Sequence, residues 1–127
     1  MQIQAFPFLH HCMLKQGDHL LCIDDVYGGT QRYLRQCFSP QTEISWSMVD
    51  MSDLKKVKSA IQKNTKIVWI ESPTNPTLKC TDIAEVAKIC KERGVLLAID
   101  NTFMSPVLQV RSSFSILFQC FYKTKFY

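Results

Sequence analysis

The stretch Val95-Leu96-Leu97-Ala98-Ile99, followed by Asp100, decides the fold class of this 127-residue chain. A continuous apolar run of this length is typical of a strand that is covered on both faces in a parallel sheet. The preceding segment, from Thr81 or Asp82 to Arg93-Gly94, has its apolar residues on one helical face and ends in a basic turn and a glycine. A helix that leads directly into a buried strand indicates an α/β architecture.

The hydrophobic pattern upstream alternates between strand and helix in the same way. Further strands are predicted at His19–Asp25, Glu43–Val49 and Lys66–Glu71. One predicted helix follows a Gly28-Gly29 turn, has Thr30 as its N-cap and runs to about Cys37. A second predicted helix is capped by Asp50 or Ser52 and has Leu54, Val57 and Ile61 on one apolar face. The predicted order is βαβαβαβ, a mostly parallel sheet with flanking helices. Residues 110–127 sustain neither period, so no regular element is predicted there.

Composition favours one domain without a nucleic-acid or membrane partner. The chain is 46% hydrophobic and has a net charge of +4. Arg111, Lys123 and Lys125 lie in the acid-free last part of the chain, so the rest is almost neutral and has no basic stripe for nucleic acid. No stretch approaches the roughly 20 apolar residues of a membrane helix, and Met1–His11 lacks the features of a secretion signal. We therefore expect a cytoplasmic chain.

The cysteines and histidines do not indicate a metal site. The six cysteines are spaced irregularly, without a C-x-x-C pair, and suit no common zinc site. We expect them to be buried free thiols in a reducing compartment. These residues are Cys12, Cys22, Cys37, Cys80, Cys90 and Cys120. His10, His11 and His19 precede or begin the first predicted strand, and we expect them at the surface or in caps.

Acidic residues follow the predicted strands. In parallel sheets, ligands bind outside the carboxyl ends of the strands, so these acids gather where a site is expected. Each acid could instead cap the turn or helix that follows, an alternative that applies most to Asp50. Glu71 and Asp100 have polar loop neighbours in Asn75, Asn101 and Thr102. The acids are Asp24-Asp25, Asp50, Glu71 and Asp100.

Three motifs in this order resemble the large domain of the transsulfuration enzymes, which are pyridoxal-phosphate (PLP)-dependent enzymes of cysteine and methionine metabolism. They are Asp24-Asp25-Val26-Tyr27-Gly28-Gly29-Thr30-Gln31-Arg32-Tyr33, Trp69-Ile70-Glu71-Ser72-Pro73-Thr74-Asn75-Pro76 and Ile99-Asp100-Asn101-Thr102-Phe103-Met104-Ser105-Pro106. The resemblance implies a fragment of the fold-type-I PLP-dependent transferase large domain over residues 13–109. Residues 1–12 are then a non-matching extension and residues 110–127 a non-matching tail.

The resemblance also implies roles in holding the cofactor, PLP. Asp100 would accept the pyridinium N–H and so keep the ring an electron sink. Tyr27 would stack on the ring and assist proton movement. Asn75 would hydrogen-bond near the cofactor's phenolic oxygen and the substrate, and Thr102 would lie against the ring.

Two further pairs of residues would support these groups. The resemblance places Glu71 and Arg32 behind the ring-binding residues, and the alternative is that they pair or cap locally. Gly28 and Gly29 would permit the turn that aims Tyr27.

The family's remaining active-site parts match less well or have no counterpart here. Lys125, in Thr124-Lys125-Phe126, lies at about the position of the family's Schiff-base lysine and is the candidate for it. The phosphate-binding loop, the residues that reach a neighbouring subunit and the C-terminal domain are not matched. Gln109-Val110-Arg111 is what reading through a CAG|GTGAG splice donor would encode, so we expect the tail to be translated intron.

For function, the resemblance implies a lyase acting on a small amino-acid substrate. The reaction would be cleavage of cystathionine to cysteine, 2-oxobutyrate and ammonia, by α-proton removal and γ-elimination, in a family of homotetramers. We expect the isolated chain to be inactive. The alternatives are the related synthase and beta-lyase branches, or a non-catalytic truncated subunit or mis-spliced product.

Overall fold

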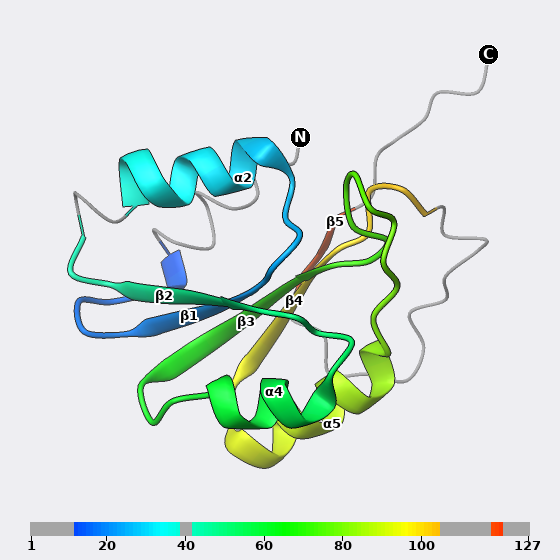
Figure 1. Cartoon of the computed structure of the whole chain (residues 1–127). Coiled ribbons are helices and arrows are strands. Elements are labelled where there is room, and N and C mark those ends of the chain that lie inside the picture. Colours follow the sequence, from blue (N-terminus) through cyan, green and yellow to red (C-terminus); the bar gives the residue numbers. More distant parts are fainter. Residues whose placement is uncertain (1–11, 39–41, 105–117, 121–127) are drawn as a thin grey trace.

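A five-stranded parallel sheet is the centre of the molecule (Figure 1). The computed structural model describes residues 12–38, 42–104 and 118–120. The strands lie in the order β2-β1-β3-β4-β5. Their bounds are β1 His19–Ile23, β2 Ser45–Val49, β3 Thr65–Glu71, β4 Leu96–Asp100 and β5 Phe118–Cys120. The predicted α/β class, with a mostly parallel sheet and flanking helices, is confirmed.

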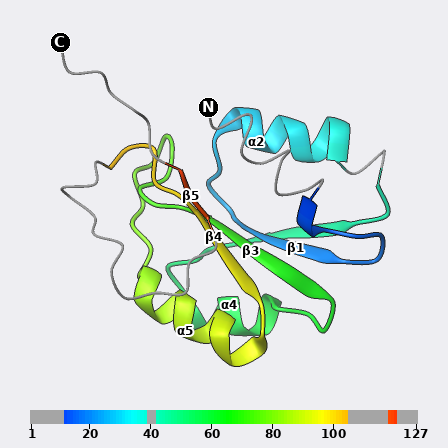
Figure 2. The same cartoon turned by 180° about the vertical axis from the view of Figure 1, so that it is seen from behind.

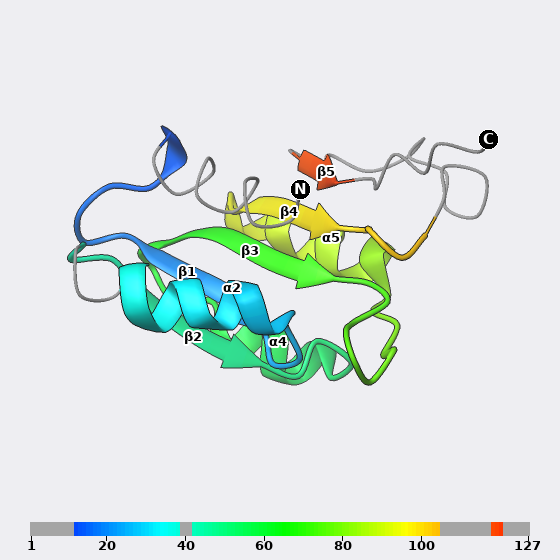
Figure 3. The same cartoon turned by 90° about the horizontal axis from the view of Figure 1, so that it is seen from above.

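Helices cover both faces of the sheet. α2 (Gly28–Tyr33) and the π-helical turn η1 (Leu34–Phe38) lie on one face, whereas α4 (Leu54–Ala60) and α5 (Ile83–Arg93) lie on the other (Figures 1 and 2). Figure 3 shows α2 lying over β1 and β2. No helix in the described ranges is long and apolar enough to cross a membrane.

The order of the strands creates a switch point between β1 and β3. The chain leaves β1 for β2 on one side and then returns past β1 to form β3 on its other side. Because parallel connections are right-handed, this reversal puts α2 and α4 on opposite faces of the sheet. A crevice at such a point, outside the carboxyl ends of the strands, is the usual ligand position in an open α/β sheet.

Side chains of β3 and β4 alternate between the two helix layers. In-register partners in a parallel sheet point to the same face, so Glu71 and Asp100 share a face. Glu71 accepts a hydrogen bond from the chain just before α2, which identifies this face as the α2 side. Ile70 and Ile99, which precede these two acids, point to the opposite face, toward α4 and α5, and are fully buried. Burial of such apolar side chains stabilises the fold.

The helix ends agree with the sequence except at two caps. Asp82 caps α5 by accepting from the Glu85 amide, and Gly94 ends it in the left-handed conformation, as predicted. The cap of α4 is neither Asp50 nor Ser52 but Asp53, whose carboxylate accepts from the first amides of the helix.

The start of α2 also differs from its prediction. No Gly-Gly turn forms, because Gly28 and Gly29 are already helical and Tyr27 is the N-cap residue, its carbonyl accepting from Gln31 N at 3.0 Å. Thr30 is therefore not a cap. It is buried inside the helix, and the chain continues through η1 rather than as one α-helix to Cys37.

β5 is an element that the sequence pattern did not predict. Its three residues pair with β4 in parallel register, from Ala98 with Phe118 to Asp100 with Cys120. Three residues are too few to show a hydrophobic period, and the edge of β4 offers unpaired backbone groups to any extended segment.

The expected burial of cysteines and exposure of histidines held only in part. Cys22 and Cys90 are buried free thiols, and burial raises the pKa of Cys90 to about 12, whereas Cys12 and Cys80 are exposed. His19 is not at the surface. It is 1% exposed because β1 is covered along its whole length. Its ring nitrogens share hydrogen bonds with Thr65 Oγ1 at 2.8 Å and with Ser47 Oγ at 2.9 Å. His10 and His11 lie outside the described residues, as do the side chains of Cys37 and Cys120.

Candidate functional site

The carboxyl ends of β1, β3 and β4 bring together acids that are far apart in the sequence. Glu71 ends β3 and Asp100 ends β4, and the two are register partners. The chain that leaves β1 reaches them through Tyr27, whose backbone N–H donates to Glu71 Oε2 at 2.9 Å. The predicted strand-end cluster therefore exists around Glu71, Asp100 and Tyr27.

Asp100 is a buried carboxylate with one oxygen fully used. The residue is only 2% exposed. Its Oδ1 accepts hydrogen bonds from Thr102 N at 3.0 Å and from Thr102 Oγ1 at 2.5 Å. Oδ2 is buried and has no hydrogen-bond partner among the described residues. An uncompensated buried carboxylate oxygen is costly, so this atom is suited to receive a donor from a bound molecule.

The Tyr27 side chain is half-buried, and its backbone N–H is bonded to Glu71, the register partner of Asp100. A Cβ on Gly29 would lie 2.5 Å from Tyr27 Cε1, so the ring packs directly over a residue without a side chain. The predicted reason for the two glycines is therefore wrong: neither Gly28 nor Gly29 has a positive φ, and Gly28 has open space around it. Gly29 is required for close approach of the ring, not for a turn.

Glu71 has the most perturbed acidity of the cluster. Burial raises its pKa to about 7, and the negative charges of Asp100 and Asp25 add to this effect. The Tyr27 N–H and the Trp69 side chain act in the opposite direction, since they stabilise the ionised carboxylate. Near neutral pH this group can therefore hold or release a proton.

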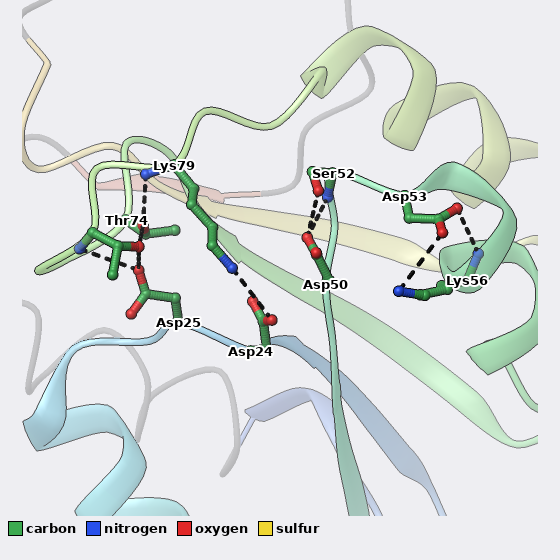
Figure 4. Close-up of polar contacts among 9 residues, drawn as sticks. Asp24, Asp25, Asp50, Ser52, Asp53, Lys56, Thr74 and Lys79 are labelled. Atoms are coloured by element: carbon green, nitrogen blue, oxygen red, sulfur yellow. Dashed lines mark hydrogen bonds and ion pairs between the residues drawn. The ribbon is translucent and has the colours of Figure 1, made fainter.

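Two aspartates at the end of β1 hold the loop that carries Asn75 (Figure 4). Asp25 Oδ2 accepts from the backbone and hydroxyl of Thr77, and Asp24 pairs with Lys79 at 3.5 Å. Hydrogen bonds from Thr74 and Thr77 lower the pKa of Asp25. Asn75 is half-buried within this loop, which the aspartates fix against the site end of the sheet.

Asp50 takes the alternative capping role. It accepts from Ser52 N at 3.0 Å and Ser52 Oγ at 2.6 Å, and these bonds lower its pKa (Figure 4). It thus stabilises the turn after β2.

The remaining candidates are placed less directly. Thr102 contacts Asp100, whereas Arg32 is exposed in the last turn of α2, where a cation suits the helix dipole. Lys125 lies outside the described residues. Sequence reasoning missed the Asp25–Thr77 contact and the bond from Tyr27 N to Glu71, because a backbone donor leaves no trace in residue types.

Comparison with solved structures defines the class of this fold and site. The crystal structure of cystathionine gamma-lyase from Lactobacillus plantarum, in complex with L-serine, superposes with a TM-score of 0.75 and 39% identity, over 80% of this chain and 26% of that chain. The described sheet and helices are thus a fragment of the PLP-dependent transferase fold.

Sequence comparison gives the family. The profile of the Cys/Met metabolism PLP-dependent enzymes matches residues 5–116, and the chain belongs to this family. It is 52% identical over 98 residues to cystathionine gamma-lyase of Macaca fascicularis and 42% identical over 97 residues to cystathionine beta-lyase of Coxiella burnetii. These alignments cover 76% of this chain but 24% and 25% of the relatives, so the chain spans about a quarter of their length.

The described residues fit the family's cofactor, PLP. Oδ2 of Asp100, which has no partner among the described residues, is the kind of buried acceptor that a protonated pyridine nitrogen needs, and Thr102 fixes the other oxygen of the same carboxyl group. Tyr27, whose backbone is bonded to the neighbouring Glu71, contributes a flat aromatic ring. The site therefore has the acceptor and the stacking surface that a protonated heteroaromatic ring requires.

Proposed function

We propose that this chain supplies the ring-holding part of the PLP site of a lyase that cleaves cystathionine to cysteine, 2-oxobutyrate and ammonia. The buried oxygen of Asp100 that has no partner among the described residues carries the proposal for the cofactor. The identity to the Macaca fascicularis protein supports the choice of reaction.

Each residue has a defined task in this proposal. PLP, when bound, supplies an electron sink for charge that develops at the substrate α-carbon. Asp100 keeps a proton on the ring nitrogen, and Thr102 orients that carboxylate through its two donors to Oδ1. Tyr27 stacks on the ring and assists proton movement. Asn75 hydrogen-bonds near the phenolic oxygen and the substrate.

The groups around these residues complete the proposed site. Glu71 supports Tyr27 from behind, and Arg32 lies at the end of the helix that Tyr27 begins. Lys125 is proposed as the Schiff-base lysine that removes the α-proton. The large-domain segment is proposed to span residues 13–109, although the family profile matches residues 5–116 and so extends into the flanking segments 1–12 and 110–127.

We also propose a cytoplasmic setting and a homotetrameric parent enzyme with a small amino acid as its substrate. The buried thiols of Cys22 and Cys90 support a reducing compartment. Because the chain matches only about a quarter of its relatives, we expect the isolated chain not to complete the reaction.

Titration with PLP tests the central assignment. The wild-type chain should bind PLP with a change in its visible absorbance, and Asp100→Asn should weaken binding at least tenfold by removing the charge that holds the ring proton. Asp82→Asn is the matched control, since asparagine caps a helix as well as aspartate does. Equal affinity of the wild type and Asp100→Asn would refute the role of Asp100.

Two further measurements address the lysine and the alternatives. Borohydride reduction of the PLP-loaded chain should leave the cofactor on Lys125 in peptide mapping, and a label elsewhere would remove that assignment. Incubation of the isolated chain with cystathionine is expected to give no product. Release of 2-oxobutyrate would show that the chain alone is the proposed lyase, and release of pyruvate would indicate a beta-lyase. A relative named as a probable cystathionine gamma-synthase, 44% identical over 97 residues, keeps that branch in the comparison.

A non-catalytic truncated or mis-spliced product is the second candidate. The β5 edge and the partly exposed Leu96 leave sheet surface open to association or misfolding. Hydrogen exchange separates the cases: cooperative protection of β1, β3 and β4 supports a folded cofactor domain, and uniformly fast exchange supports a misfolded remnant.

A further inference from the structure

Glu71 is bonded to one half of the proposed ring site and is the strand neighbour of the other half. Its Oε2 accepts the Tyr27 N–H at 2.9 Å, and its strand neighbour in register is Asp100. The residue is 2% exposed, so neither interaction is screened by bulk water. A carboxyl group in this position costs more free energy than an apolar residue would, which calls for an explanation beyond packing.

We propose that Glu71 is a positioning residue that holds the Tyr27 backbone at the strand end next to Asp100, so that the stacking ring and the ring-nitrogen acceptor are kept together. This inference rests on the proposed PLP site. It goes beyond it by giving a defined task to a group that touches neither cofactor nor substrate.

The Tyr27 amide needs this particular acceptor. Tyr27 precedes the first residue of α2, so its N–H is outside the helical ladder, and Glu71 Oε2 is the partner that the structure gives it. The contact fixes the backbone from which the ring projects over Gly29. A displaced amide would therefore carry the ring away from Asp100.

The charges that face Glu71 explain how it can lie beside Asp100. Asp100 from β4 and Asp25 from the end of β1 oppose its ionisation, as burial does, while Tyr27 N and Trp69 favour it. Cys22 of β1 faces the same carboxylate, whose charge helps to raise the pKa of that thiol. A proton on Glu71 removes one negative charge from beside Asp100, the carboxyl group proposed to receive the ring proton.

Two variants and two nuclear magnetic resonance readouts test the inference without any cofactor. Glu71→Gln keeps an oxygen that can accept from Tyr27 N, and Glu71→Ala does not. We expect Tyr27 amide exchange to rise about tenfold in Glu71→Ala and to stay within about threefold of wild type in Glu71→Gln. Glu92→Gln, on the exposed face of α5, is the control and should change nothing.

The second readout is the Asp100 carboxyl carbon resonance. In the wild type it should shift with a midpoint near pH 7 as Glu71 ionises, and this inflection should vanish in Glu71→Gln. This comparison does not need Glu71→Ala to fold. Unchanged Tyr27 exchange in a folded Glu71→Ala, or an Asp100 inflection that persists in Glu71→Gln, would overturn the inference.

A PLP-loaded measurement separates this inference from the proposed function. The visible circular dichroism of bound PLP reports how rigidly the ring is held, and it should fall at least twofold in Glu71→Ala and recover in Glu71→Gln. If wild type binds no PLP but shows both resonance effects, the proposed cofactor site fails while the Tyr27–Glu71–Asp100 unit stands. If PLP binds and the resonance effects are missing, the positioning role fails alone.

Discussion

Glu71→Gln should become more stable relative to wild type as pH rises from acid to neutral. The folded chain raises the pKa of Glu71 from 4.5 to about 7, so the native state holds a proton that the unfolded state releases over this range. Stability contributed by the protonated group is fully present below pH 4.5 and is lost as pH rises through 7. Each pKa unit corresponds to about 1.4 kcal/mol, so with a pKa raised from 4.5 to about 7 the rise in pH lowers the free energy of unfolding by about 3 kcal/mol in total.

The measurement is urea unfolding followed by far-ultraviolet circular dichroism at several pH values from 4.5 to 8. The free energy of unfolding of Glu71→Gln minus that of wild type should increase by about 3 kcal/mol across this range, because the amide has no proton to lose. His19, whose pKa is lowered by burial, is present in both proteins, so its contribution cancels in the difference. A difference that is constant with pH, or that decreases, would refute the burial argument for Glu71.

Three other changes follow from contacts that the structure defines. Gly29→Ala should displace the Tyr27 ring and lower the free energy of unfolding in urea by about 1–3 kcal/mol, since its Cβ would lie 2.5 Å from Tyr27 Cε1. Gly28→Ala, which has open space around it, should be neutral or stabilising. Equal effects of the two substitutions would contradict the close approach of the ring to Gly29. Asp53→Ala should destabilise the chain by about 1 kcal/mol and Asp53→Asn by much less, and a similar loss in both would exclude a capping role. Burial lowers the pKa of His19, so the unfolded state binds a proton more tightly than the folded state, and wild type should lose stability as pH falls below 6.5. His19→Gln should not show this loss. An unchanged dependence of the free energy of unfolding on pH in this range would contradict the argument.

The parallel sheet could be predicted because its strands follow the rules of local pattern. The run from Leu97 to Ile99 is apolar because both faces are covered, and the helix before it ends at a glycine that adopts a left-handed conformation. Asp53 was missed as a cap because three acceptors, at positions 50, 52 and 53, compete in one short turn. β5 was missed because pairing with β4, not its own sequence, creates it.

The site could be predicted as a set of residues but not as a set of contacts. Parallel topology puts Glu71 and Asp100 at one edge, so their proximity follows from the sequence pattern. The bond to Tyr27 N does not, because it depends on where α2 begins, and the predicted start at Thr30 was too late. Gly29 could be read as important, yet only the position of the Tyr27 ring shows why.

The placement of the acids explains how one sheet edge can hold both a charge and a proton. Asp24 and Asp25 are satisfied by Lys79 and Thr77 in the loop that carries Asn75, so their charges are used in holding that loop. Glu71 and Asp100 lie deeper, and Asp100 Oδ1 accepts two hydrogen bonds from Thr102. Burial and the neighbouring negative charges raise the pKa of Glu71 and so favour a proton on this residue. A cationic ring nitrogen that binds at Asp100 would lessen the repulsion between Asp100 and an ionised Glu71, and Glu71 would then ionise more easily. Binding near neutral pH should therefore release protons. Calorimetry in buffers of different ionisation enthalpy measures the number of protons released.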